Sequence, residues 1–226
     1  MMKTSAKFLL RITLFLFTSL ILFAKPDSTE IYIKDGFQNS ETNQLADLIN
    51  VEKITVSFSD TNLIGKIFMI SKDEYINGEK KEEKALIRCG KDSVITVIGG
   101  DTIHYMLPDA CEKMSYKKND STFSIQFLCD NSSDTAKIKI EFPRISILFS
   151  IGKKELPGYH MRDILNSNYS GFIPVNQKVP IIAFSPPFDM GSGVSNYCIL
   201  TNKPVEDWNK YYKLNHYVVF YLEIKD

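Results

Sequence analysis

The chain has 226 residues with 27 basic and 27 acidic side chains, so its formal net charge at pH 7 is zero. No segment is basic enough to follow a nucleic-acid backbone, which argues against a protein that binds DNA or RNA. The sequence also lacks the Cys and His spacings of zinc sites and the motif of a phosphate-binding loop, so it predicts neither a metal nor a cofactor.

The first 24 residues predict an export signal. Three basic residues occur within the first eleven positions, and a largely apolar run over residues 12–23 precedes the small residue Ala24. Because a membrane-spanning helix needs roughly 20 apolar residues, cleavage is favoured over a retained anchor. We therefore expect residues 1–24 to be removed, and the mature protein to be periplasmic or extracellular without a stable membrane anchor.

The mature chain would keep 202 residues, enough to bury roughly 70% of its unfolded surface in a proper core. Because the signal contains three basic and no acidic residues, the mature chain would carry a formal charge of −3. A charge of that size favours solubility and indicates no particular partner.

Alternating apolar and polar residues predict strands through most of the following segment. Turn sequences such as Asp35-Gly36 and Asn77-Gly78 separate several of them. One short helix is expected over residues 40–49, with Leu45, Leu48 and Ile49 on its buried side. The predicted strands cover residues 30–34, 53–58, 63–70, 85–89, 93–98, 102–107, 121–129 and 135–142.

Short strands separated by turns predict a mainly β protein, an antiparallel β-sandwich or a partly open barrel. A parallel sheet would need a helix of about ten residues or more between strands, and no such pattern occurs. We expect this β-sandwich domain, with its short N-terminal helix, to span residues 25–152.

The pattern changes from residue 153 onward. Six prolines fall between positions 157 and 204, so mostly irregular structure is expected, with a short helical turn over residues 161–165. Order returns with a strand over 195–201, a short helix over 204–212 and a final strand over 216–224 that is apolar on both faces. Residues 153–226 are therefore expected to be a C-terminal α+β extension, either a subdomain packed on the first domain or an excursion that returns a strand to it.

Four cysteines, Cys89, Cys111, Cys129 and Cys198, follow the predicted signal. An even number in an exported chain predicts two disulfides, with three possible connectivities. We favour Cys89 with Cys111 and Cys129 with Cys198. Alternatively, Cys129 is a small buried apolar residue, because it is in phase with Phe127 on one strand face.

Aromatic residues near the C-terminus provide the candidate partner or ligand surface. The only tryptophan, Trp208, stands among Tyr211, Tyr212, Tyr217 and Tyr221. Exposed rings of this kind stack on sugars or anchor a protein partner. The alternative is that Trp208 and Tyr212, four residues apart, pin the short helix to the sheet.

Catalytic arrangements are less well supported. Cys198 and His216 lie on neighbouring predicted strands and could form a thiol–imidazole pair, but a disulfide suits an exported cysteine better. His160 lies near Asp163 in one short polar cluster, which does not by itself define a proton-transfer site. The sequence therefore predicts an exported, non-enzymatic protein that binds a partner protein or a glycan. The alternative is a secreted hydrolase whose carboxylates, such as Asp163 or Asp189, converge only in the fold.

Overall fold

The computed structural model describes residues 27–81, 84–87, 89–90, 93–98, 101–106, 109–154, 158–165, 171–189, 195–196 and 203–226. The predicted signal peptide, residues 1–24, lies outside these ranges, and so does Cys198. Within the described part, no helix is long and apolar enough to cross a membrane.

Two antiparallel sheets form the body of the protein, as the mainly β prediction expected, and neither closes on itself in the described part. The first sheet has the order β11-β10-β9-β3-β2, and the second has the order β12-β14-β17-β4-β5, with β6 also paired to β4. The first sheet contains β2 (Tyr32–Asp35), β3 (Val51–Phe58), β9 (Phe123–Asp130), β10 (Thr135–Phe142) and β11 (Ile145–Gly152). The second contains β4 (Ile67–Ile76), β5 (Glu79–Lys80), β6 (Lys84–Ala85), β12 (His160–Asp163), β14 (Val179–Ser185) and β17 (His216–Lys225).

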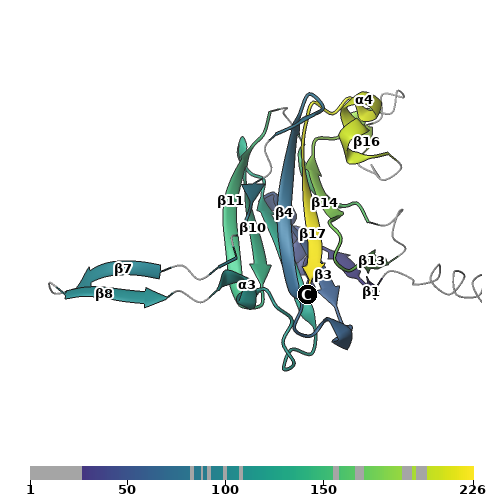
Figure 1. Cartoon of the computed structure of the whole chain (residues 1–226). Helices are drawn as coiled ribbons and strands as arrows, with labels where there is room; N and C mark the ends of the chain where they lie inside the picture. Colours follow the sequence, from purple (N-terminus) through teal and green to yellow (C-terminus); the bar gives the residue numbers. More distant parts are fainter. Residues whose placement is uncertain are drawn as a thin grey trace, which may run out of the picture.

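The two sheets face each other across one apolar core (Figure 1). Every second residue of β9 is buried, because successive side chains of a strand point to opposite faces. Rings from the two sheets meet in this core: the centroids of Phe68 and Phe123 are 4.2 Å apart, and those of Phe127 and Phe220 are 5.7 Å apart. Burial of such rings is the main source of stability for the pair of sheets.

The last strand, β17, pairs with β4 over ten residues, from His216↔Ile76 to Lys225↔Ile67. It is buried on both faces, as its sequence predicted. Its outer face contributes to a second apolar cluster, which the 3-10 helix η2 (Val205–Asp207) and helix α4 (Trp208–Tyr212) cover (Figure 1). Strands from both sides of the predicted boundary at residue 152 thus share one sheet, however the chain is divided into domains.

The proline-rich segment contains more strand than its sequence predicted. Residues 160–163 form β12 rather than a helical turn, because their backbone pairs with β14. Pro180 lies within β14 beside an irregularity in the pairing with β17, where its missing N–H is tolerated. Strand β11 was also missed, although every second residue from Ile145 to Ile151 is apolar.

Smaller elements lie around this body. Asp60 caps the 3-10 helix η1, and Asp109 caps the one-turn helix α3 through its side-chain oxygen. These elements are η1 (Thr61–Leu63), α3 (Ala110–Lys113) and the pairs β1 (Ser28–Glu30) with β13 (Phe172–Pro174), β15 (Phe188–Asp189) with β16 (Ser195–Asn196), and β7 (Ser93–Ile98) with β8 (Asp101–Met106).

Helix α2 (Ser40–Leu48) lies between β2 and β3. The side chain of Asn39 caps it by accepting hydrogen bonds from the N–H groups of Glu41 and Thr42, and Asn50 follows it in the left-handed conformation common after helix ends. The buried side predicted for this segment is wrong, because the side chain that faces the body is Ala46. The three aliphatic residues predicted to be buried are exposed instead: Leu45, Leu48 and Ile49.

The β7–β8 hairpin stands clear of the two large sheets in Figure 1. A disulfide between Cys89 and Cys111 lies at its base, with the two Cα atoms 5.3 Å apart, which confirms the first predicted pairing. The second predicted pairing is wrong, because Cys129 is a free, fully buried thiol in the core. Burial raises the pKa of Cys129 well above its ordinary value, so the thiol is inert and acts as a small apolar side chain.

Candidate functional site

The predicted aromatic surface is largely buried. Trp208 is 1% exposed and Tyr217 is fully buried, with the two ring centroids 5.3 Å apart. The Trp208 indole N–H donates to the carbonyl of Lys203 at 3.1 Å, and the Tyr217 hydroxyl donates to the carbonyl of Val205 at 2.8 Å. These bonds hold η2 and α4 against the second sheet, so this pair acts in packing rather than in recognition.

The three remaining aromatics of that set differ in exposure, and Tyr221 is buried. Tyr212 is half-buried against Phe188, whereas Tyr211 is 47% exposed, and the Lys203 ammonium lies 4.5 Å from its ring centroid. One exposed ring is too little for a stacking platform, which uses several flat faces together.

His216 is buried between two polar partners. Its Nδ1 lies 2.7 Å from the Tyr159 hydroxyl, and its Nε2 lies 3.1 Å from Glu74 Oε1. Because Cys198 lies outside the described residues, the thiol–imidazole pair stays a prediction. The contacts present bridge β4 and the segment before β12, and they satisfy a buried imidazole.

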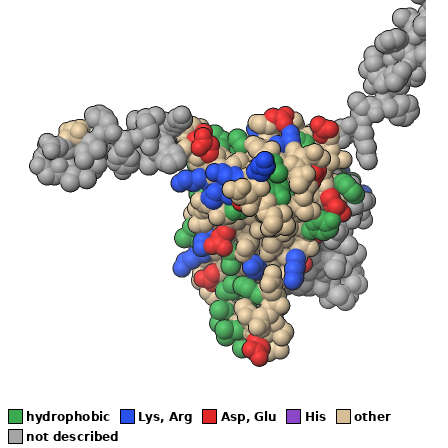
Figure 2. Space-filling view, turned by 90° about the horizontal axis from the view of Figure 1, so that it is seen from below, with side chains coloured by type: hydrophobic (Ala, Val, Ile, Leu, Met, Phe, Trp, Pro, Cys, Tyr) green, Lys and Arg blue, Asp and Glu red, His purple; other side chains and the backbone are tan. Residues whose placement is uncertain are grey.

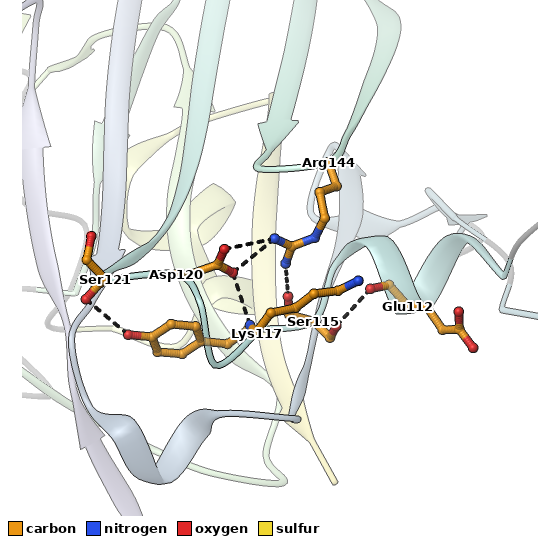
Figure 3. A network of polar contacts seen from close by, with 7 residues as sticks. Glu112, Ser115, Lys117, Asp120, Ser121 and Arg144 are labelled. Carbon is orange, nitrogen blue, oxygen red and sulfur yellow. Dashed lines mark hydrogen bonds and ion pairs between the residues drawn. The ribbon is translucent and has the colours of Figure 1, made fainter.

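Arg144 holds a network of polar contacts in the turn between β10 and β11 (Figure 3). Its Nη1 donates to both carboxylate oxygens of Asp120, at 3.1 and 2.9 Å, and its Nη2 donates to the carbonyl of Ser115. The N–H of Lys117, at 3.0 Å, is the largest cause that lowers the pKa of Asp120, and Arg144 lowers it further against the effect of burial. The network ties this turn to the segment between α3 and β9, and the charges of Arg144 and Asp120 are paired in it.

A groove of about 590 Å³ lies beside Arg144 on the outer face of the first sheet. Ser124, Gln126 and Glu141 contribute polar side chains to it. Arg144 already pairs with Asp120 through Nη1 and donates to the Ser115 carbonyl through Nη2, while its Nε is buried with no hydrogen-bond partner among the described residues. Most of its charge is thus used inside the protein, and the groove offers no strong anchoring charge to a ligand.

A second pocket, of about 230 Å³, lies between α2, the first sheet and β12. Strand β2 supplies Asp35, strand β3 supplies Glu52, and β12 supplies His160 and Met161. Glu52 contacts two residues of β12, His160 and Met161. Its Oε1 lies 2.6 Å from His160 Nδ1, and its Oε2 accepts a hydrogen bond from the N–H of Met161 at 2.6 Å. Two sheets that share no backbone pairing here are thus joined by one carboxylate.

The mouth of this pocket is formed by the turn before α2. Gly36 has a φ of +78°, and a Cβ there would lie 2.9 Å from Asn43 Oδ1, so both the conformation and the space require glycine. The Asn43 side chain accepts the N–H of Phe37 at 2.5 Å and donates to its carbonyl at 3.0 Å. The turn is therefore held rigidly against the helix.

Two carboxyl groups in or beside this pocket, those of Asp35 and Asp163, have raised pKa values. Desolvation in the pocket, and then the charge of Glu52, raise the pKa of Asp35. Burial raises the pKa of Asp163, the Leu165 N–H partly opposes that shift, and the charge of Asp35 raises it further. Perturbed carboxyl groups in a pocket are typical of functional sites, although ion networks also produce them.

The pocket adjoins the exposed end of α2, since Ala46 and Asp47 of this helix line it. Three aliphatic side chains are exposed at this end of the helix: Leu45 is 59% exposed, Leu48 is 80% exposed, and the C-cap residue Ile49 is 53% exposed. Their spacing of three and four residues places them on one helix face. We call this face and the adjoining pocket, with Asp35, Asp47 and Glu52, the α2 surface.

Metal binding finds no support in the described residues, where no group of three or more His, Cys, Asp or Glu side chains is placed to hold an ion. The face shown in Figure 2 has acidic, basic and hydrophobic side chains interspersed, with no single sign of charge dominant.

Comparison with known proteins finds no matching family model, no similar curated protein and no similar solved structure.

Sequence reasoning missed most of the α2 surface. Asp35 was interpreted only as a turn residue, and His160 is 108 positions from Glu52, so no local motif connects them. One signal was available: three aliphatic residues at helical spacing on a nine-residue helix were recognised as one face, although that face was assigned to the core.

Proposed function

We propose that this chain is an exported, non-enzymatic β-sandwich protein that binds a partner protein through the α2 surface. The observation that carries the proposal is the exposure of Leu45 and Leu48 on one face of the short helix α2, together with that of Ile49 at its C-cap. Single exposed aliphatic side chains are common, but a contiguous apolar group rimmed by polar residues is typical of an interaction site.

Charge around this face favours a particular kind of partner. Asp35, Asp47 and Glu52 line the adjoining pocket, where Lys53 is the only lysine or arginine among the lining residues. Desolvation raises the pKa of Asp35, and the charge of Glu52 raises it further; a basic side chain entering the pocket would offset this second, electrostatic cause. The expected partner segment therefore presents aliphatic side chains with a Lys or Arg beside them.

A protein partner suits the surface better than a glycan. Aliphatic helix faces dock in apolar contacts with other polypeptides, whereas glycans are bound on flat aromatic rings. In the described residues, the ring expected to form such a platform, Trp208, is buried.

Binding of synthetic peptides tests the proposal. The probe is a set of 15-residue fluorescent peptides that pair Leu or Ile with Lys, with Glu, or with neither, measured by anisotropy against the mature chain. We expect the Lys-containing aliphatic peptides to bind, and Leu48→Lys to weaken that binding at least tenfold. The matched control is Leu148→Lys, a 70% exposed leucine on β11, at the opposite edge of the first sheet from β2.

Three outcomes would overturn this function. These are equal binding of the Glu and Lys peptides, equal loss in both leucine variants, or no peptide binding together with retention on a glycan array that Leu48→Lys does not change.

A second candidate function, hydrolysis by paired carboxyl groups, is favoured by one observation. Asp35 and Glu52 line the same pocket, and Asp163 is close enough to interact with Asp35. A carboxyl group with a raised pKa is suited to general acid catalysis. The other carboxylate expected from the sequence, Asp189, has no described side chain.

Turnover of chromogenic glycosides and esters tests this candidate. Hydrolysis that falls at least a hundredfold in Asp35→Asn, with unchanged folding, would establish it. Hydrolysis that persists in Asp35→Asn, or no turnover of either substrate class, would reject it.

A further inference from the structure

Strand β11 is an unprotected edge of the first sheet. It pairs with β10 along its whole length, from Phe142↔Ile145 to Thr135↔Gly152, and with no other described strand. Its second row of backbone N–H and C=O groups is therefore left without a strand partner in the described part of the chain. Figure 1 shows β11 at the rim of the first sheet.

Edge strands usually carry features that block pairing with another chain, such as charges, prolines, bulges or short length. Strand β11 has eight residues, no charged side chain, no proline and no shift of register. The other edges differ: β2 has four residues and contains Lys34 and Asp35, and β12 has four residues and contains Arg162 and Asp163. Among the edge strands of the two large sheets in the described part of the chain, which also include the two-residue strands β5 and β6 with Glu79, Lys80 and Lys84, β11 alone combines length with the absence of charge.

The side chains of β11 are also incompletely covered. Ile145, Ile147 and Phe149 point toward the core but are only partly buried against it. The Phe149 ring lies 5.9 Å from Phe220, so it stands at the open margin between the two sheets. On the opposite face of the strand, Leu148 is 70% exposed. A strand added beside β11 would place side chains next to these residues on both faces of the sheet.

The sequence of β11 is chemically palindromic about Leu148. On either side of this residue stand Ile147 and Phe149, then Ser146 and Ser150, then Ile145 and Ile151. If the strand lies antiparallel to a copy of itself with Leu148 opposite Leu148, Ser146 faces Ser150. In the same register Ile147 faces Phe149, a favourable pair of β-branched and aromatic side chains.

We propose that β11 pairs with β11 of a second copy of this chain, in a two-fold antiparallel register centred on Leu148. The two first sheets then form one continuous sheet across the dimer. A two-fold interface requires a surface that is complementary to itself, and a palindromic, uncharged strand meets that requirement. The inference does not depend on the α2 surface, which lies at the other end of the sheet order.

The oligomeric state gives the first test, measured by light scattering over a range of concentrations of the mature chain. We expect a dimer whose dissociation constant rises at least tenfold in Leu148→Lys, because the register places two like charges directly opposite. The exposed position of Leu148 lets this variant fold. The matched control, Leu48→Lys on α2, should leave the dimer unchanged.

Cysteine cross-linking tests the register itself, with a short bis-maleimide and the wild-type chain as background. Leu148→Cys should cross-link to itself, because opposite residues of paired strands have Cβ atoms about 5 Å apart. Ser146→Cys and Ser150→Cys should cross-link far better when mixed than either does alone. A mixture of Leu148→Cys with Leu48→Cys measures random collision.

Several results would overturn the proposal. A wild-type chain that is monomeric at all concentrations would show that the edge is not self-paired. A dimer that Leu148→Lys does not weaken would place the interface elsewhere. Cross-linking of Leu148→Cys no faster than random collision would reject the register.

Discussion

The Arg144 network and the pocket beside α2 shift the pKa of a carboxyl group in opposite directions. Asp120 is surrounded by donors, and the Lys117 N–H and Arg144 lower its pKa. Asp35 lies beside Glu52 in a pocket that desolvates it, so its pKa is raised. One region therefore gains stability from its charge, while the other loses some.

That difference separates a structural role from a functional one. A network whose charges are all paired fixes the loops it joins and has little left to offer a ligand. In the pocket, by contrast, like-charged carboxylates lie near each other. A cation that bound there would gain an attractive electrostatic interaction with them. Functional sites commonly cost stability in this way.

The largest expected effect is on the balanced network. Arg144→Ala removes the donors to Asp120 and to the Ser115 carbonyl, so the free energy of unfolding should fall by about 2 kcal/mol. Urea denaturation measures the change. The control is Lys139→Ala, which breaks an exposed ion pair with Glu141 on the same sheet and should cost no more than about 0.5 kcal/mol. Equal losses in the two variants would show that the Arg144 network stabilises the protein no more than an exposed ion pair does.

A smaller effect is expected from Asp120→Asn, about 1 kcal/mol of destabilisation at neutral pH. Because the folded pKa of Asp120 is lowered, its stabilisation is complete above the ordinary carboxyl range and is lost as the pH falls through the folded value. The variant and the wild type should therefore converge in stability as the pH falls below the ordinary carboxyl range, as followed by thermal melting across pH. A difference that stays constant with pH would show that charge is not its cause.

The smallest effect, of opposite sign, is expected from Asp35→Asn. The folded pKa is raised, so the charged carboxylate is unfavourable above that value and the penalty disappears as the pH falls through the ordinary carboxyl range. Because Asp35 is exposed, solvent screening limits the gain at pH 7 to about 0.5 kcal/mol or less. The melting temperature should rise slightly at pH 7 and match the wild type near pH 3. A melting temperature below that of the wild type at pH 7 would contradict the inference that the charge of Asp35 is unfavourable in the folded protein.

The strands with strict alternation could be predicted from the sequence. Residues 135–142 form β10 as expected, and β17 is buried on both faces as its pattern indicated. Local periodicity is enough where one strand face meets the core. It failed at β12, where backbone pairing with β14 determines the conformation.

The candidate site could not be predicted in the same way. Leu45 and Leu48 show a helical pattern, but a pattern does not reveal whether a face meets the core or solvent. Asp35 and Glu52 come from different strands, and the pocket that they line is completed by residues of β12, which lies more than 100 positions further along the chain. Trp208 shows the converse, since a large aromatic residue is more often a packing residue than a binding one.

The Cys89–Cys111 disulfide has a consequence for how this protein can vary. The Cα atoms that enter and leave the hairpin segment are 5.3 Å apart, a span that a tight turn also closes. We therefore expect that a different loop, or a short turn, can replace the β7–β8 hairpin without changing where the chain leaves and rejoins the body, provided that Asp109 is kept to cap α3. The disulfide fixes the two ends of this segment, so its sequence can change while the two sheets stay the same.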